Sequence, residues 1–259
     1  MAQFSSSGNG YRLRWKGTFS AALSSLSGMS SRGQAESWTR GRLPQQFPRM
    51  TLWSLDNANW RAECVRLCLF SAGVPFDDRR TNYGELSLSG HLRFGTFPVM
   101  EVNGRIIAQS HAIATYVGKL TGFYPVDPWL GAKVDEVLAA LTDATDLIAT
   151  TMQEQNPVKR AHWRQRLITD DGRLLQVLGG LEDVLAENAR NGLCAGDELS
   201  VADFAVWCAV GWFSGCLDGI PRDYIARNFP HMWSLHLSVD TLVCVEEWKR
   251  MYPKHYGPT

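Results

Sequence analysis

Residues 97–113 contain the side chains and turns best suited to holding a small anion. The run reads Phe-Pro-Val-Met-Glu-Val-Asn-Gly-Arg-Ile-Ile-Ala-Gln-Ser-His-Ala-Ile. Ser110 occupies the position expected for a helix N-cap. The helix beyond it would offer unpaired backbone amides and the positive end of its dipole. We therefore expect a small peptide ligand that carries a carboxylate.

A hairpin and a helix must position this run. Asn103-Gly104 is the dipeptide that type I′ turns prefer, because both central residues need positive φ. The flanking segments 99–102 and 105–108 are strand-like, so we expect them to pair antiparallel. The helix that opens at Ser110 has an apolar stripe and should end at Gly122.

Two further segments extend the pattern, and together the three resemble the cytosolic glutathione transferases, most closely the sigma-like class. The upstream segment is Trp60-Arg-Ala-Glu-Cys-Val-Arg-Leu67, and the downstream one is Leu199-Ser-Val-Ala-Asp-Phe204. The resemblance spans roughly residues 50–250. Each motif alone is weakly specific, whereas three in the family's order and spacing are strongly specific.

The resemblance implies a glutathione site on the hairpin. In the family the proline is cis, and the main chain of the preceding residue, here Phe97 before Pro98, pairs with the cysteinyl part of glutathione. The Gln109-Ser110 pair holds the γ-glutamyl end, although a plain helix cap would also explain both residues. Asp135 matches an aspartate that reaches across a dimer to the partner's glutathione; a solvated charge on a helix face is the alternative.

The sequence departs from the family at the residue that activates the sulfur. A free thiol has a pKa of about 8.5, so a donor is needed to stabilise the thiolate. Sigma-like enzymes use a tyrosine at the end of the first strand, where this chain has Leu55. Ser54, Asn57 and Asn59 are the candidate replacement donors, helped by the dipole of the next helix. A strand hydroxyl bonded locally is the alternative for Ser54.

Aromatic and imidazole side chains surround the implied site. His91 falls where the family often has a lysine for the glycyl carboxylate, and a neutral imidazole would bind that group less well. An ordinary loop histidine is the alternative. Trp53 and Trp60 flank the presumed sulfur position and could wall an apolar pocket for an electrophile, or they could belong to the core.

The order of periodic segments predicts an α/β fold plus an all-α part. A thioredoxin-like domain at 50–122, with a mixed four-stranded sheet and helices, should precede an all-helical domain at 129–259. The first domain should hold strands at 51–55 and 76–81, a helix at 60–72, and the hairpin and helix already described.

Helical periodicity dominates the second domain. Ser200 and Asp203 form a capping box at the start of one of its helices. The expected helices cover 129–153, 158–188 with a break near 170–172, 200–217, and parts of 224–251.

The charge is distributed unevenly along the chain. The total is balanced, with 26 basic and 26 acidic residues, but residues 1–49 hold seven basic residues and one acid, Glu36. The remainder is mildly acidic, which argues against binding nucleic acid. The Ser- and Arg-rich extension at 1–49 predicts a mitochondrial or plastid transit peptide, or else a disordered tail of a cytoplasmic protein. A third alternative is that translation starts at Met50.

Cysteine spacing and hydropathy exclude several classes. The six cysteines include no Cys-x-x-Cys pair and no clustered histidines, so neither a metal site nor a dithiol redox site is expected. Buried free thiols are favoured over a disulfide framework. No apolar run reaches the roughly 18 residues that a membrane span needs.

These expectations combine into one function and two rivals. The leading hypothesis is a homodimeric glutathione transferase that joins glutathione, as co-substrate, to small hydrophobic electrophiles without a metal or further cofactor. The first rival is a non-catalytic binding, scaffold or complex-subunit protein of the same fold that has lost the tyrosine. The second is a thiol-disulfide reductase, against which the lack of a cysteine near Leu55 counts.

Overall fold

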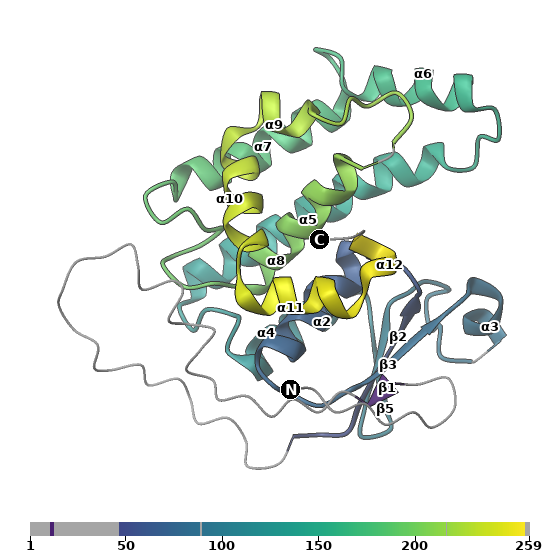
Figure 1. Ribbon diagram of the computed structural model, residues 1–259, viewed down its shortest axis with the longest axis vertical. Helices are drawn as coiled ribbons and strands as arrows, with labels where there is room; N and C mark the ends of the chain where they lie inside the picture. Colours follow the sequence, from purple (N-terminus) through teal and green to yellow (C-terminus); the bar gives the residue numbers. More distant parts are fainter. Residues whose placement is uncertain (1–10, 13–46, 89, 216, 257–259) are drawn as a thin grey trace. The chain divides into compact units, whose positions relative to one another are not determined.

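The computed structural model describes residues 11–12, 47–88, 90–215 and 217–256 (Figure 1). These residues fall into two compact units, the first made of residues 1–124 and 241–259 and the second of residues 125–240. The predicted extension at 1–49 lies mainly outside the described residues. Its role as a transit peptide or tail therefore stays a prediction.

The first unit is built on a mixed β-sheet with strand order β1-β3-β2-β4-β5. Its strands are β1 (Tyr11–Arg12), β2 (Met50–Leu55), β3 (Asp77–Thr81), β4 (Val99–Val102) and β5 (Arg105–Ala108). β2 and β3 run parallel, whereas β4 pairs antiparallel with both β2 and β5. The mixed four-stranded sheet expected from the sequence is therefore confirmed. The short strand β1 adds an antiparallel edge beside β3 that no sequence signal predicted.

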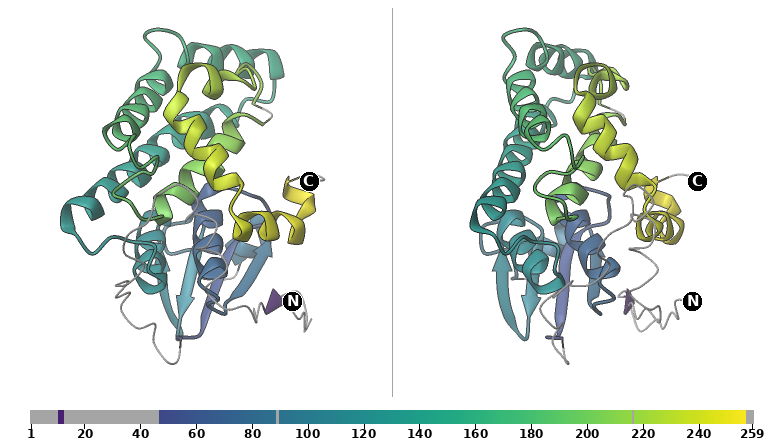
Figure 2. Two further views of the ribbon diagram at one scale, coloured as in Figure 1. Left: turned by 60° about the vertical axis from the view of Figure 1, so that its left-hand side comes forward. Right: turned by 90° about the vertical axis from the view of Figure 1, so that its left-hand side faces the viewer.

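The helices of the first unit come from both ends of the chain. They are α2 (Trp60–Ser71), α3 (Tyr83–Leu88), α4 (Ser110–Thr121), α11 (Val243–Met251) and α12 (Pro253–Tyr256). α2 packs against α4 and against α11 (Figure 2). Its side chains from Trp60 to Phe70, except Arg61, are buried, so α2 is a core helix rather than an amphipathic surface helix.

Glycine ends two of these helices, as the sequence predicts. Gly73 follows α2 with φ +66°, and Gly122 closes α4 with φ +81°. Glycine reaches such angles without the steric cost of a Cβ atom. The short helix α3 was not predicted, because six residues are too few to show a helical period.

The regular elements among the described residues of the second unit are all helices, joined by loops. α8 packs against α10 and α5, and α5 also packs against α7. The helices are α5 (Pro128–Thr151), α6 (Pro157–Leu167), α7 (Arg173–Glu187), α8 (Val201–Phe213), α9 (Tyr224–Asn228) and α10 (Pro230–Asp240). The break expected near 170–172 separates α6 from α7. No described helix in either unit is long and apolar enough to cross a membrane.

The predicted capping box at the start of α8 is present. The amide and the hydroxyl of Ser200 both donate to Oδ2 of Asp203, at 2.6 Å and 2.7 Å. The amide of Cys194 donates to Oδ1 at 2.7 Å. Burial raises the pKa of Asp203, and these hydrogen bonds act in the opposite direction. The box thus fixes the entry into the buried helix α8.

The last two helices return to the first unit. α11 packs against α2, and residues 241–259 cluster with the sheet rather than with the preceding helices. The sequence analysis assigned all of 129–259 to one helical domain. The contacts instead assign α11 and α12 to the unit that contains the sheet.

Candidate functional site

Three chain segments meet in a row across one end of the sheet. Trp53 of β2 pairs with Val99 of β4, and Val99 pairs with Ala108 of β5, both antiparallel. The next residue along each strand is therefore Ser54, Pro98 or Gln109. The register places these three predicted site positions side by side, although they are far apart in sequence.

The peptide bond between Phe97 and Pro98 is cis, as the resemblance implies. Pro98 is buried and Phe97 is partly exposed. The ring of Phe97 meets that of Tyr83 edge to face, with 6.1 Å between ring centroids. The main chain of Phe97 therefore lies next to Pro98, at the end of the sheet where Ser54, Pro98 and Gln109 are neighbours.

The structure corrects the position of the N-cap of α4. The cap is Gln109, with φ 74° and ψ 118°, and Ser110 is the first helical residue. The carbonyl of Gln109 already accepts the first helical hydrogen bond, from the amide of Ile113 at 3.0 Å. A non-glycine residue at this φ is strained, and such strain is common at binding sites.

The side chain of Ser110 contacts a residue that the sequence analysis had not singled out. Arg61 donates from Nη1 to the hydroxyl of Ser110 at 3.3 Å. Ser110 is 6% exposed. Arg61 is the only residue between Trp60 and Phe70 of α2 that is not buried. This exposure singles Arg61 out, but it follows from the packing of α2 and is not visible in the sequence. A cation therefore stands at the N-terminus of α4.

The N-terminus of α4 has the character of an anion site. No side chain among the described residues caps it. The amides of its first turn point along the helix axis away from the helix, where a helix dipole favours negative charge. The guanidinium of Arg61 adds a full positive charge beside it.

The predicted sulfur donors lie at the end of β2 and the start of α2. Ser54 is 2% exposed and shares the buried face of β2 with Leu52. Leu55, at the family's tyrosine position, is the last residue of β2. Asn59 is the N-cap of α2, and its Oδ1 accepts from the amide of Arg61 at 3.0 Å. The oxygen of Asn59 therefore serves the helix cap, and its Nδ2 is the group that could donate to a sulfur.

The two tryptophans that were expected to wall a pocket differ in their burial. Trp60 is 1% exposed and belongs to the core, so the pocket expectation is wrong for this residue. Trp53 is partly exposed and stacks on His91, with ring centroids 4.6 Å apart. His91 Nε2 also lies 3.8 Å from Oε2 of Glu101. His91 thus has a defined place beside Trp53 and an acid.

Asp135 lies in the second unit, on α5, whereas the other site residues belong to the first. It is partly buried. Its role across a dimer stays a prediction.

The described residues hold no group of three or more His, Cys, Asp or Glu side chains that could bind a metal. Cys64, Cys68, Cys194, Cys208 and Cys244 are free thiols, the first four of them buried. Burial raises the pKa of Cys64 to about 12, which keeps this thiol protonated and inert near neutral pH.

Comparison with known proteins points to one family. A family model for the glutathione S-transferase N-terminal domain matches residues 48–119. Rat glutathione S-transferase alpha-1 is 33% identical over 96 residues, 36% of this chain and 43% of that protein. That match covers less than half of the relative's length. Hematopoietic prostaglandin D synthase of chicken is 25% identical over 201 residues, 76% of this chain and 94% of that protein.

Solved structures agree on the fold. Prostaglandin synthase D of Nilaparvata lugens superposes with a TM-score of 0.67 at 23% identity, covering 80% of this chain and 99% of that one. A glutathione S-transferase from Necator americanus, Na-GST-3, gives 0.65 at 23% identity, covering 79% and 98%. The matched segment 48–119 contains the row of Ser54, Pro98 and Gln109 and the start of α4. The family match over residues 48–119, the relatives and the solved structures together support a cytosolic glutathione transferase family for this chain.

Proposed function

We propose that this protein is a glutathione transferase that joins glutathione to small hydrophobic electrophiles. One observation carries the proposal: the cis bond before Pro98, the strained Gln109 and the Arg61–Ser110 pair converge at one end of the sheet. Such a place offers main-chain groups, a helix N-terminus and a cation to a peptide that carries carboxylates.

Each part of glutathione would find a partner there. The main chain of Phe97 would pair with the cysteinyl residue, as a strand edge pairs with an extended peptide. The γ-glutamyl end would meet Gln109, Ser110 and the first-turn amides of α4. Arg61 would contribute charge-assisted hydrogen bonds to its carboxylate.

The chemical step needs the glutathione sulfur as a thiolate. The thiolate attacks an electrophilic carbon, the new C–S bond takes its electron pair from sulfur, and the leaving group departs with the pair of the broken bond. We assign thiolate stabilisation to the dipole of α2 and to Nδ2 of Asn59, with Arg61 nearby. Ser54 could contribute only if its buried hydroxyl turned toward the sulfur. No metal or further cofactor is required.

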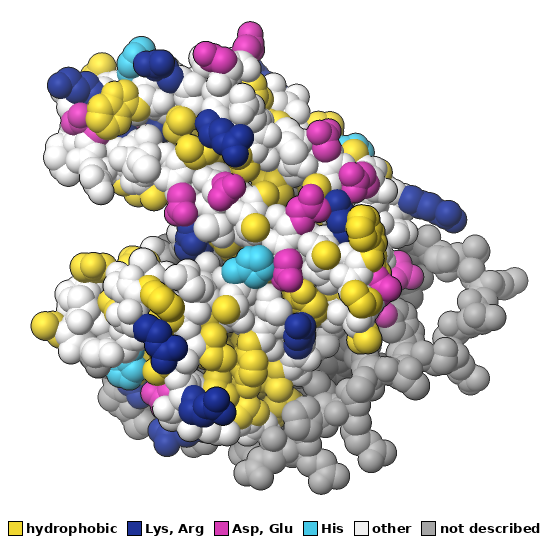
Figure 3. Space-filling view, turned by 180° about the vertical axis from the view of Figure 1, so that it is seen from behind, with side chains coloured by type: hydrophobic (Ala, Val, Ile, Leu, Met, Phe, Trp, Pro, Cys, Tyr) yellow, Lys and Arg dark blue, Asp and Glu magenta, His cyan; other side chains and the backbone are white. Residues whose placement is uncertain are grey.

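Three finer proposals accompany this function. We propose a homodimer, because large apolar side chains remain exposed on the first unit, among them Leu88 and Phe94, the latter 57% exposed. Hydrophobic side chains also gather on the lower part of the face seen in Figure 3. We further propose the sigma-like class, and a cytoplasmic location unless residues 1–49 direct import into an organelle.

The rival proposal is a non-catalytic protein of the same fold. Leu55 at the family's tyrosine position and the burial of Ser54 favour it. The similarity to a protein named as a prostaglandin D synthase adds a second reaction to assay, prostaglandin D synthesis.

One experiment separates the enzyme from its rival. The full chain is passed over immobilised glutathione, and the retained protein is assayed for conjugation of a chloronitrobenzene. Retention with turnover supports the transferase, whereas retention without turnover on any electrophile supports the non-catalytic protein. Ser54→Ala then tests the hydroxyl, since unchanged turnover would remove Ser54 from the mechanism.

A further inference from the structure

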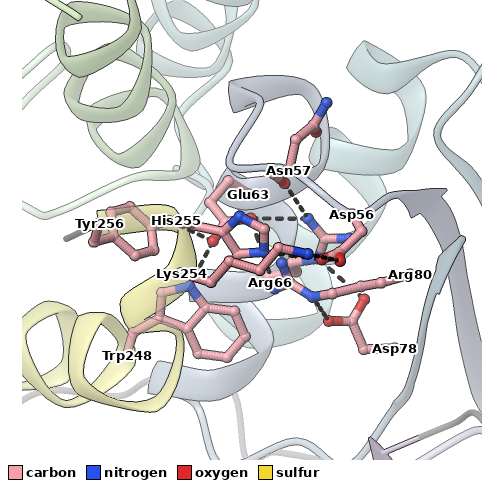
Figure 4. A network of polar contacts seen from close by, with 10 residues as sticks. All are labelled: Asp56, Asn57, Glu63, Arg66, Asp78, Arg80, Trp248, Lys254, His255 and Tyr256. Atoms are coloured by element: carbon pink, nitrogen blue, oxygen red, sulfur yellow. Dashed lines mark hydrogen bonds and ion pairs between the residues drawn. The ribbon is translucent and has the colours of Figure 1, made fainter. Parts of the chain in front are cut away.

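The C-terminal segment of the chain is bonded to the loop that follows β2. Lys254 Nζ lies 2.8 Å from Oδ2 of Asp56, and Nε2 of His255 lies 2.9 Å from its Oδ1 (Figure 4). Asp56 directly follows Leu55, the position of the family's sulfur-activating tyrosine. All of these residues belong to the first unit. The C-terminus thus reaches the part of the site where the sulfur is expected.

A buried carboxylate anchors the same segment to α2. Glu63 Oε1 accepts from the indole Nε1 of Trp248 at 2.6 Å and from the hydroxyl of Tyr256 at 2.5 Å. Its other oxygen accepts from Nη1 of Arg66 at 2.8 Å. Glu63, Arg66 and Trp248 are fully buried. The position of Tyr256 is therefore tied to the core of the unit and not only to its surface.

Arg66 connects this anchor to the loop. Its Nη1 donates to the carbonyl of Asn57 at 3.3 Å, and its Nε donates to Asp78 of β3 at 3.0 Å. Asp78 in turn accepts from Nε of Arg80 at 2.7 Å, and the guanidinium of Arg80 lies 4.1 Å from the ring centroid of Tyr252. The loop is thus held by Arg66 through the Asn57 carbonyl, and by Lys254 and His255 through the Asp56 carboxylate (Figure 4).

The charge of Asp56 gives this arrangement a chemical consequence. Asp56 is the neighbour in sequence of Leu55, beside which the glutathione sulfur is expected. A carboxylate at this place would oppose ionisation of the thiol, because a nearby negative charge raises the pKa of an acid. Lys254 places a compensating positive charge directly on this carboxylate, and the ring of His255 hydrogen-bonds its other oxygen. The other charged groups of the network are Glu63 and Arg66 on α2 and Asp78 and Arg80 on β3, two of each sign.

We propose that residues 243–256, here called the C-terminal clasp, position the loop 55–59 and neutralise Asp56, and so favour the thiolate of bound glutathione. Lys254, His255 and Tyr256 are positioning residues, since they act through Asp56 and Glu63. This inference rests on the proposed glutathione site. It adds the C-terminal clasp, a segment distant in sequence, to the parts of the chain that influence the pKa of the glutathione thiol.

The test measures the pKa of bound glutathione by the ultraviolet absorbance of its thiolate across a pH series. The variants are Lys254→Gln combined with His255→Gln, and Lys254→Arg combined with His255→Gln, which keeps one positive charge. Arg250→Gln is the matched control, because it removes an exposed cation of the same segment that pairs only loosely with Glu246, at 3.8 Å.

We expect the doubly neutral variant to raise the thiol pKa by about half a unit, since the pair is exposed and screened, with little change in glutathione affinity. The variant that keeps Arg at 254 should restore most of the shift, and the control should match the wild type. A thiol pKa that stays at the wild-type value in the doubly neutral variant, while glutathione still binds, would overturn the proposal.

Amide hydrogen exchange tests the C-terminal clasp without the need for bound glutathione. Tyr256→Phe removes one hydrogen bond to Glu63 and should accelerate exchange at residues 56–61 several-fold, with or without glutathione. If the wild type binds no glutathione, the proposed function fails and exchange alone decides whether the clasp holds the loop. Unchanged exchange in Tyr256→Phe would then overturn the clasp as well.

Discussion

The indole of Trp248 donates a 2.6 Å hydrogen bond to Oε1 of Glu63, a residue 185 positions earlier in the chain. Both side chains are fully buried. This contact joins the end of the helical half to the core helix α2 of the thioredoxin-like unit. The first unit is therefore complete only when the chain beyond residue 240 is present, which makes its stability sensitive to the C-terminus.

Removing the carboxylate of Glu63 should destabilise the protein strongly. Among the described residues, Glu63→Ala leaves the buried guanidinium of Arg66 with only Asp78 as a charged partner within 4 Å, and it removes one hydrogen-bond acceptor from Trp248 and one from Tyr256. Breaking a buried ion pair typically costs about 3–5 kcal/mol. Urea unfolding should show a loss of this order. Glu136→Ala, at an exposed carboxylate whose partner Lys133 keeps a second ion pair with Glu187, is the control and should change stability by less than about 1 kcal/mol.

Acidification should weaken the contact between Asp56 and the C-terminal clasp. The hydrogen bond from Lys254, and then that from His255, lowers the pKa of the Asp56 carboxyl below its ordinary value of about 3.9. A lowered folded pKa means that the stabilisation is complete above that ordinary value and is lost as pH falls through the folded pKa.

The comparison of wild type with Asp56→Asn isolates this effect. Their unfolding free energies should differ by less than about 1 kcal/mol at pH 6, because the pair is exposed. The difference should shrink further as the pH is lowered below about 4. A difference that grew on acidification would contradict the assigned ion pair.

Substitutions at Gln109 should separate backbone strain from ligand binding. Gln109→Gly relieves the cost of φ 74°, so it should stabilise the fold by about 1 kcal/mol. It also removes the side chain that would hold the γ-glutamyl group, so glutathione affinity should fall. Gln109→Ala keeps the strain and loses the same side chain. Both variants should bind glutathione more weakly, and only the glycine variant should gain stability in thermal unfolding.

Thiol labelling should distinguish buried cysteines from accessible ones. Burial raises the pKa of Cys64 to about 12, and it also raises the pKa of Cys194, where the nearby charge of Asp203 adds to the effect. Iodoacetamide at pH 7.5 should leave both residues unmodified in the native protein. Mass spectrometry of peptides would show this, with urea-unfolded protein as the control in which both react. Rapid native labelling of Cys64 would be incompatible with its place in α2.

Local patterns predicted most of the first unit. The Asn103-Gly104 turn is present, with φ 51° and 81°, because only a few residue types tolerate those angles. The stops at Gly73 and Gly122 and the capping box at Ser200 were predictable for similar reasons. Each of these signals acts over four residues or fewer, within the reach of a sequence pattern.

Other features depended on contacts that a single sequence does not reveal. Ser110 was expected as the N-cap, but the strained backbone of Gln109 moves the cap one residue earlier. Trp60 was expected near a pocket, but the packing of α2 buries it. The contact between Arg61 and Ser110 and the one between Trp248 and Glu63 join residues 49 and 185 positions apart. Residue type and spacing carry no signal for such pairs.

Calorimetric titration of glutathione into the full-length protein tests the central claim most directly. We expect one saturable site per chain, weakened about tenfold or more by Ser110→Ala, because that change removes the hydroxyl beside Arg61 and a charge-assisted hydrogen bond is worth about 1.5–3 kcal/mol. Thr142→Ala, at a threonine of the second unit that bonds only within its own helix, should bind as the wild type does. The absence of saturable heat in the wild type, or equal affinity in Ser110→Ala, would contradict a glutathione site at this end of the sheet.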